Sequence, residues 1–155
     1  MGKIEARLKE LGITLPAVAN PVANYVPYSV SGSLVFIAGQ ICLKDGKVAY
    51  AGRVGADIDV ETGKAAARLC GLNILAALKA ACGGDLDRVV RCLRLGGFVN
   101  AAPDFLDVPA VINGASDLIV EVFGDAGRHA RTAVGAVLPR ASAVEVDGIF
   151  EIRPQ

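Results

Sequence analysis

Two charged side chains near the C-terminus have the types and spacing that small-molecule chemistry requires. Arg131 opens an apolar run, and Glu145 follows in a segment that alternates between apolar and charged residues. A guanidinium presents a planar fork of N–H donors that can hold a carboxylate in one orientation. A partly buried carboxylate can take a proton from water and return it. Together these groups could bind a small carboxylic acid and move protons on it.

Both side chains also have simpler interpretations. Arg131 could be a surface residue at the start of a strand, paired with Asp125 or Asp147. Glu145 could be a solvated position on the last strand. The residue types alone leave these alternatives open, because structural ion pairs on strands are common.

Apolar periodicity predicts the elements that would position these side chains. Residues 1–12 form an amphipathic helix, and a proline-containing connection follows it. Asp107 is a typical N-cap, and Pro109 fits the first turn of the helix that it would begin. The expected long helices cover about 60–82 and about 107–123, and the expected strands cover 34–41, 88–100, 131–137 and 143–152, with an Asp-Gly turn at 45–46 closing a hairpin.

The predicted order is β-β-α-β-α-β-β behind an N-terminal helix. It indicates an α+β fold in which a mixed sheet carries two helices on one face, with Arg131 and Glu145 on adjacent strands. Apolar residues make up 53% of the 155 residues, and the uncovered face would bury this excess by self-association. We therefore expect one domain over residues 1–155, with 1–19 as helix and connection, that forms a homo-oligomer.

Composition excludes several classes of function. Sixteen basic and sixteen acidic residues cancel, so nothing resembles a nucleic-acid-binding surface. No run approaches the about 18 consecutive apolar residues of a membrane span. The N-terminus lacks the apolar core of a secretory signal, which predicts a cytoplasmic protein. The cysteines are widely spaced, which favours buried reduced thiols over a metal site; they are Cys42, Cys70, Cys82 and Cys92.

Established catalytic motifs are missing from the sequence. No GxGxxG, GxSxG or HExxH segment occurs. A Ser-His-Asp triad or a cysteine nucleophile would need His129, the only histidine. A lone histidine is more often solvated at a strand end than catalytic. We interpret Arg128 and His129 as parts of an exposed turn.

Three short segments, in this order, resemble a known family. They are AGQI at 38–41, HARTAV at 129–134 and AVEV at 143–146. Over roughly residues 20–152 the chain is similar to the reactive intermediate deaminase (RidA/YjgF) family, whose members have a chorismate-mutase-like fold and form trimers. The segments GGFVNAAPDF and NGASDLIVEVFGDAGRHAR resemble a distinct bacterial branch of it.

The resemblance implies a role for each matching residue. The family's arginine that grips the substrate carboxylate matches Arg131, and its glutamate that handles protons and a water matches Glu145. In the family the pocket lies between subunits, so these groups would come from two neighbouring chains. The other implied binding residues are Gly39 and Gln40 after the first strand, a pocket-closing Tyr25, Asn113 from the second long helix, and the backbone of Ala133.

The implied activity is the hydrolysis of small reactive 2-imino or 2-enamino acids to 2-keto acids and ammonia, without a metal or organic cofactor. Many family members carry a cysteine at the position of Ala133, and relatives often carry a small hydroxyl residue at that of Ala38. These differences, with the branch-specific segments, could change the substrate. Two alternatives stay open: a non-catalytic trimer that binds small carboxylates, and the ribonuclease activity attributed to some relatives. Neutral charge and 5% aromatic residues weigh against RNA.

Overall fold

The computed structural model describes residues 1–20 and 23–154. Pro21 and Val22 of the predicted connection, and Gln155, lie outside the described residues. The helices are α1 (Lys3–Glu10), α2 (Val60–Ala81) and α3 (Val108–Phe123), and the strands are β1 (Tyr28–Ser31), β2 (Leu34–Ile41), β3 (Leu43–Lys44), β4 (Lys47–Val48), β5 (Val89–Val99), β6 (Ala130–Gly135) and β7 (Val144–Ile152).

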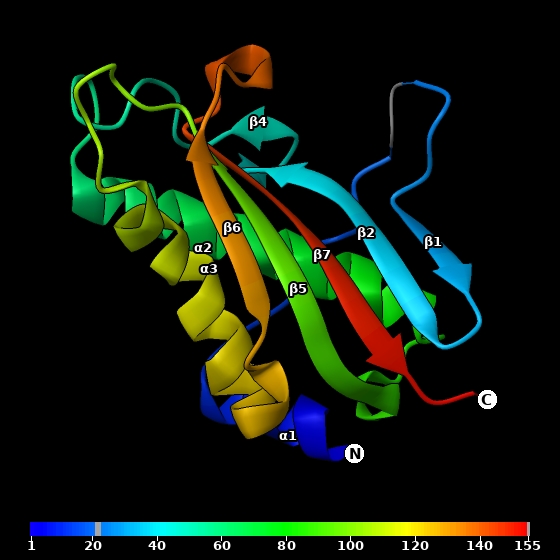
Figure 1. Ribbon diagram of the computed structural model, residues 1–155. Helices are drawn as coiled ribbons and strands as arrows, with labels where there is room; N and C mark the ends of the chain where they lie inside the picture. The colour runs from blue at the N-terminus through cyan, green and yellow to red at the C-terminus, as the bar shows by residue number, and fades with distance from the viewer. Residues whose placement is uncertain (21–22, 155) are drawn as a thin grey trace.

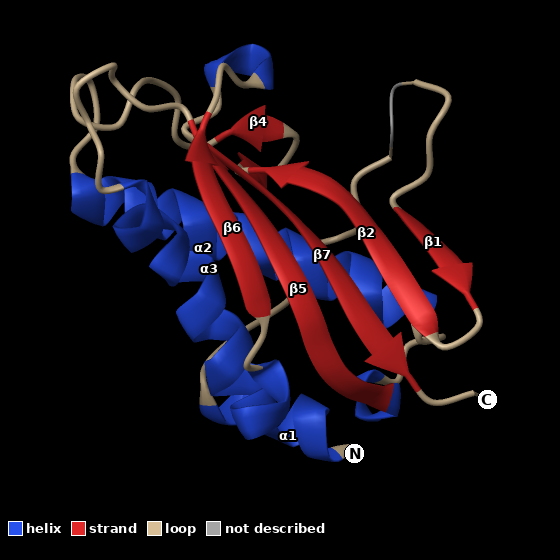
Figure 2. Ribbon diagram, in the orientation of Figure 1, coloured by secondary structure: helices blue, strands red, loops and turns tan. Residues whose placement is uncertain are grey.

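The main sheet has the strand order β1-β2-β7-β5-β6. Strands β5 and β6 run parallel, whereas the other neighbours are antiparallel. Helices α2 and α3 pack on one face of this sheet, and the described residues leave the opposite face open (Figures 1 and 2). The predicted α+β fold, a mixed sheet with two helices on one face and an additional N-terminal helix, is confirmed.

Strand β7 shows how the sequence produces two different faces. Val144, Val146 and Phe150 are fully buried, because every second side chain of a strand points to the same face. The residues between them, Glu145 and Asp147 among them, are half-buried on the open face. The helix-facing side chains of β7 therefore belong to the core, which also contains Ile74, Leu75, Leu95, Ile112, Leu118 and Ile119.

The two long helices begin differently. The Asp59 carboxylate caps α2 by accepting a hydrogen bond from the Thr62 N–H at 2.8 Å. Asp107 occupies the predicted N-cap position of α3, but its side chain makes no capping hydrogen bond. Pro109 lies in the first turn of α3, as expected. Gly124, with φ of +63°, ends this helix in a conformation that glycine adopts most easily.

The strand arrangement corrects three expectations. Strand β1, which contains two serines, pairs with β2 and was missing from the predicted order. The Asp45-Gly46 turn closes a hairpin as predicted, but β3 and β4 form a separate two-stranded sheet. Arg131 and Glu145 do not lie on adjacent strands, because β5 separates β6 from β7.

Within residues 1–20 and 23–154, no helix is long and apolar enough to cross a membrane. The longest helix, α2, instead turns its buried face toward the sheet and α3, and this face contains the small residues Ala66, Ala67 and Gly71. Small side chains let the two helix backbones approach closely.

Gly114 marks the closest approach of α3 to α2. A Cβ atom at this position would collide with the backbone carbonyl of Lys64. We expect Gly114→Ala to lower the free energy of unfolding by about 1–3 kcal/mol, because a backbone atom cannot yield as a flexible side chain can. Urea unfolding at fixed protein concentration measures this loss. Gly135→Ala is the control, since its Cβ would meet Ala101 at an ordinary 3.7 Å. If Gly114→Ala left the urea midpoint of unfolding unchanged, this would contradict tight packing of α3 against α2 at Gly114.

Candidate functional site

Arg131 on β6 points toward the first turns of α3. Its Nη1 donates to Asn113 Oδ1 at 2.8 Å and to Ser116 Oγ at 3.1 Å. Its Nη2 donates to the Pro109 carbonyl at 3.3 Å. A guanidinium has five N–H donors, so these three bonds leave Nε–H and one Nη2–H without a partner among the described residues. These two donors are adjacent on the guanidinium, and such a pair can bind a carboxylate bidentately.

A hydrogen-bonded chain behind Arg131 fixes the orientation of its partners. His129 Nδ1 lies 2.6 Å from the Gly127 carbonyl, which can only accept, so Nδ1 carries the proton. In the neutral ring, Nε2 therefore accepts from the Ser116 hydroxyl at 2.9 Å. The Ser116 oxygen is then left to accept from Arg131. This chain holds the guanidinium in one position before any ligand arrives.

Glu145 lies in a different place, at the edge between β7 and β2. A cavity of about 620 Å³ opens beside it and is lined by Tyr25, Gly39 and Gln40, three of the predicted binding residues. A Cβ atom at Gly39 would lie 2.5 Å from Glu145 Oε2. Glycine at this position therefore leaves room for the carboxylate. The Gln40 side chain donates to the Ala38 carbonyl at 3.0 Å.

The electrostatic environment of Glu145 suits a group that exchanges protons. Partial burial, and then the negative charge of Asp147 on the same face of β7, raises the pKa of Glu145 above its ordinary value. Asp147 is itself paired with Arg94 at 3.3 Å. A carboxyl group with a raised pKa is a better proton carrier near neutral pH than an ordinary surface glutamate.

The predicted site residues therefore form two groups on opposite faces of one sheet. Arg131 pairs with Leu95, a fully buried residue of the helix-facing side. Glu145 pairs with Phe98, and its neighbours Val144 and Val146 point to the helices, so its own side chain points to the open face. One chain cannot direct both side chains at the same small molecule. Asn113 and Ala133 lie with the arginine, and Tyr25, Gly39 and Gln40 lie with the glutamate.

The alternative pairings of Arg131 are wrong. Asp125 instead pairs with Arg128 at 3.4 Å, and Asp147 pairs with Arg94. Arg128 is an exposed residue, as predicted. The histidine next to it is not, since it is half-buried in the chain that reaches Arg131.

Three side chains at the two groups were missed from the sequence: Ser116, Asn73 and Arg140. A fourth, His129, was considered but assigned to an exposed turn. Ser116 lies one helical turn after Asn113, and this i, i+3 spacing is a signal that could have identified it. Asn73 and Arg140 line the cavity beside Glu145. Arg140 has a left-handed φ of +56° and donates to the Gly46 carbonyl at 3.3 Å. Nothing in the sequence near these two residues indicated a common cavity.

Thiol or metal chemistry finds little support in the described part of the chain. All four cysteines are free and buried. Burial raises the pKa of Cys92 to about 12 and raises those of Cys70 and Cys82, which opposes thiolate formation. Across residues 1–20 and 23–154, no three His, Cys, Asp or Glu side chains cluster in a way that could hold a metal ion.

Comparisons with known proteins agree with this fold. Residues 5–151 match the family model described as "YjgF/chorismate_mutase-like, putative endoribonuclease". Protein TCP17 of Trypanosoma cruzi is 48% identical over 153 residues, which cover 97% of this chain and 95% of that protein.

Two crystal structures extend the comparison. Atu1372 from Agrobacterium tumefaciens, a protein of unknown function, is 51% identical with a TM-score of 0.90, and the match covers 97% of this chain and 94% of that one. A "putative endoribonuclease" from Shewanella oneidensis is 41% identical with a TM-score of 0.93, over 97% of this chain and 100% of that one.

The fold and these matches define an α+β protein of the YjgF type. The chain belongs to the YjgF/chorismate-mutase-like family, as the sequence resemblance indicated. Because a trypanosome protein is among the similar sequences, such relatives are not confined to bacteria. The assignment to a bacterial branch stays a prediction.

Proposed function

We propose that this protein hydrolyses small 2-imino and 2-enamino acids to 2-keto acids and ammonia, at sites that two neighbouring chains complete. One chain contributes Arg131 with Asn113 and Ala133. The next contributes Glu145 with its cavity. The assembly that we propose is a homotrimer of this 15.9 kDa chain, and light scattering tests it, with an expected mass near three times that value.

The observation that carries the proposal is the separation of Arg131 and Glu145 onto opposite faces of the sheet. Among the described residues, each group lacks the other's charged side chain: the arginine group has free donors but not Glu145, and the cavity beside Glu145 does not include Arg131. Contact between the β6 edge of one chain and the open face of another would join them. The family resemblance supports a pocket of this kind.

The reaction requires only positioning and proton transfer. The substrate carboxylate accepts from Nε–H and Nη2–H of Arg131, which fixes the C=N carbon relative to the partner's carboxylate. Glu145 removes a proton from water as the oxygen attacks that carbon, and passes it to the nitrogen. The carbinolamine hydroxyl then gives its proton to Glu145, and Glu145 passes this proton to the amino nitrogen as the C–N bond breaks. Neutral ammonia leaves, the 2-keto acid remains, and Glu145 is ionised again.

Two other functions predict different behaviour. A trimer that only binds small carboxylates would retain the arginine site without accelerating hydrolysis. The family description includes endoribonuclease, and that activity would release nucleotides from RNA. The raised pKa of Glu145 favours the deaminase, because a binding site for an anion gains nothing from a partly buried carboxylate nearby.

Combining two impaired variants tests the proposal directly. At substrate concentrations well below KM, Arg131→Ala and Glu145→Gln should each release 2-keto acid from an enzymatically generated 2-imino acid at about a hundredth of the wild-type rate or less. Co-expressed in equal amounts, they should recover about a quarter of wild-type activity, because random assembly gives that fraction of interfaces both intact groups. Each variant alone, at the same concentration, is the control.

The possible outcomes separate the three functions. No recovery on mixing, with both variants folded and assembled, would contradict a site shared between chains. The binding trimer would be favoured if wild-type protein binds 2-keto acids but does not hydrolyse the 2-imino acid faster than buffer alone. RNA cleavage that survives both substitutions would favour a nuclease at another site.

A further inference from the structure

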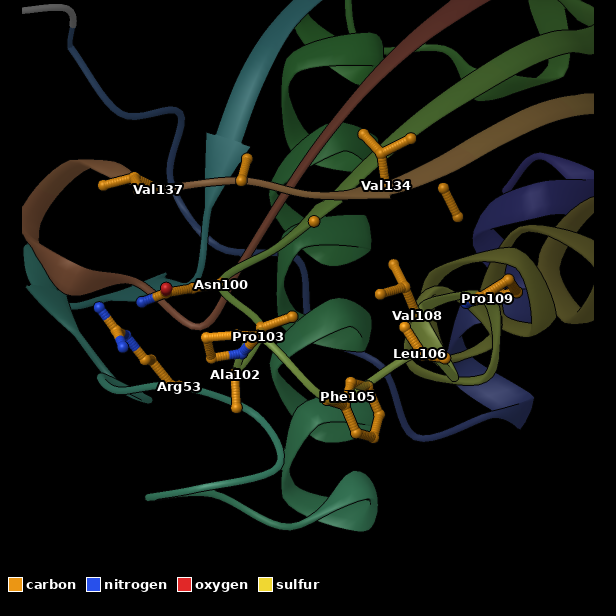
Figure 3. A pocket seen from close by; sticks show the side chains of 14 residues that line it. Arg53, Asn100, Ala102, Pro103, Phe105, Leu106, Val108, Pro109, Val134 and Val137 are labelled. Carbon is orange, nitrogen blue, oxygen red and sulfur yellow. The ribbon is translucent and has the colours of Figure 1, made fainter.

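An apolar cleft of about 670 Å³ lies beyond the Arg131 group, where β6 ends (Figure 3). Residues 133–137, at the end of β6 and just after it, form one wall, with the Ala133 side chain on the Arg131 face and the Val134 side chain on the opposite, open face. The segment that connects β5 to α3, with Phe105 and Leu106, forms the other. The volume lies within the range of about 300–1,000 Å³ that is typical of small-molecule sites.

The cleft exposes large apolar side chains that nothing in the described chain covers. Leu106 is 85% exposed, and Val137, near Asn100 at the far end of the cleft, is 94% exposed (Figure 3). Single exposed apolar residues are common, but a group of them around one concave surface marks a binding site. Burial of these side chains by a ligand would stabilise the complex.

The wall formed by the connecting segment is held in place by the backbone. Val54 N–H donates to the Asn100 carbonyl at 2.8 Å, and Ala102 N–H donates back to the Val54 carbonyl at 2.9 Å. Phe105 N–H donates to the Ala102 carbonyl at 3.0 Å. These bonds are made within the chain itself, so they hold this wall in place and lower the entropic cost of binding.

The cleft is continuous with the arginine group. The Pro109 carbonyl accepts from Arg131, and Pro109 also lines the cleft. Ala133 lines it as well, two residues after Arg131 and on the same face of β6. Polar side chains, Arg53 and Asn100, lie at the end away from Pro109 (Figure 3). A molecule anchored at the guanidinium would therefore meet apolar walls first.

We propose that this cleft receives the side chain of the substrate, and that the protein prefers 2-imino acids with a branched aliphatic side chain over those with a methyl group. This inference rests on the proposed function, since it places the carboxylate at Arg131. An isobutyl group is short enough to stay among the apolar residues before the polar end of the cleft. Its burial adds to the affinity by about 0.8 kcal/mol for each CH2 group.

Calorimetric titration with two 2-keto acids tests the preference. Pyruvate and 4-methyl-2-oxopentanoate share the carboxylate and keto group and differ only in the side chain. We expect wild-type protein to bind the branched acid at least about tenfold more tightly, given three additional carbons. Leu106→Asn should reduce this difference and leave the affinity for pyruvate unchanged. Leu106 is 85% exposed, so the variant should fold.

Val30→Asn is the matched control. Val30 is a 47% exposed apolar residue on β1, the edge strand opposite β6, and its substitution should leave both affinities unchanged. Equal binding of the two acids by wild-type protein would overturn the side-chain subsite and leave the deaminase proposal standing. Failure of both acids to bind would remove the deaminase proposal as well. A smaller assembly mass for Leu106→Asn would show that the cleft contacts another subunit, and would also overturn the inference.

Discussion

Replacing Arg131 by alanine should lower kcat/KM for 2-imino acids by about 10²–10⁴, because two hydrogen bonds to a charged group are lost at about 1.5–3 kcal/mol each. The loss should appear mainly as a higher KM, and as a matching increase in the Kd of 2-keto acids. Arg131→Lys should recover little activity, since a lysine keeps the charge but not the planar fork. Release of 2-keto acid measures the rate, and calorimetry measures the binding.

Arg128→Ala provides the matched control for this substitution. Arg128 has the same charge, lies three residues away, and is paired with the exposed Asp125. It makes no contact with the Asn113–Ser116 group among the described residues, so its loss should change kcat/KM less than about twofold. An equal effect of the two substitutions would show that Arg131 acts only through general positive charge. Unchanged binding in Arg131→Ala would remove the carboxylate anchor altogether.

The elements that could be predicted are those with a long apolar period. Helices α2 and α3 were predicted to within a few residues, because their buried stripes extend over several turns. Strand β1 was missed because four residues with two serines do not form an apolar pattern. The insertion of β5 between β6 and β7 was also missed, since strand order depends on contacts between distant segments.

The candidate site was predictable only in part for the same reason. Family resemblance identified Arg131 and Asn113, and the structure places them 2.8 Å apart. It also identified Gly39 and Glu145 separately, and the close approach of these two residues, which only the structure shows, explains why a glycine is needed there. The separation of the two groups onto opposite faces follows from strand register, which one-dimensional spacing does not contain.

Glu145→Gln should lower kcat by about 10²–10⁴, which is the usual contribution of a positioned acid or base. The Kd of 2-keto acids should change much less, because the arginine group stays intact. Stability gives a second readout. Since the folded-state pKa of Glu145 is raised, its charged form disfavours folding above that pKa. The variant should therefore be at least as stable as wild type at pH 7, so that lost activity is not lost folding.

The pH dependence of the rate tests the same residue from another direction. The proposed mechanism begins with ionised Glu145, so activity should fall as pH drops through its raised pKa. This fall on the acid side of the pH–rate profile, the acid limb, should disappear in Glu145→Gln. Asp147→Asn removes one cause of the raised pKa and should move the limb to lower pH, while the burial that raises it most remains. Glu151→Gln, also half-buried on β7, is the control and should not move it. A limb that persists in Glu145→Gln would assign the proton transfer to another group.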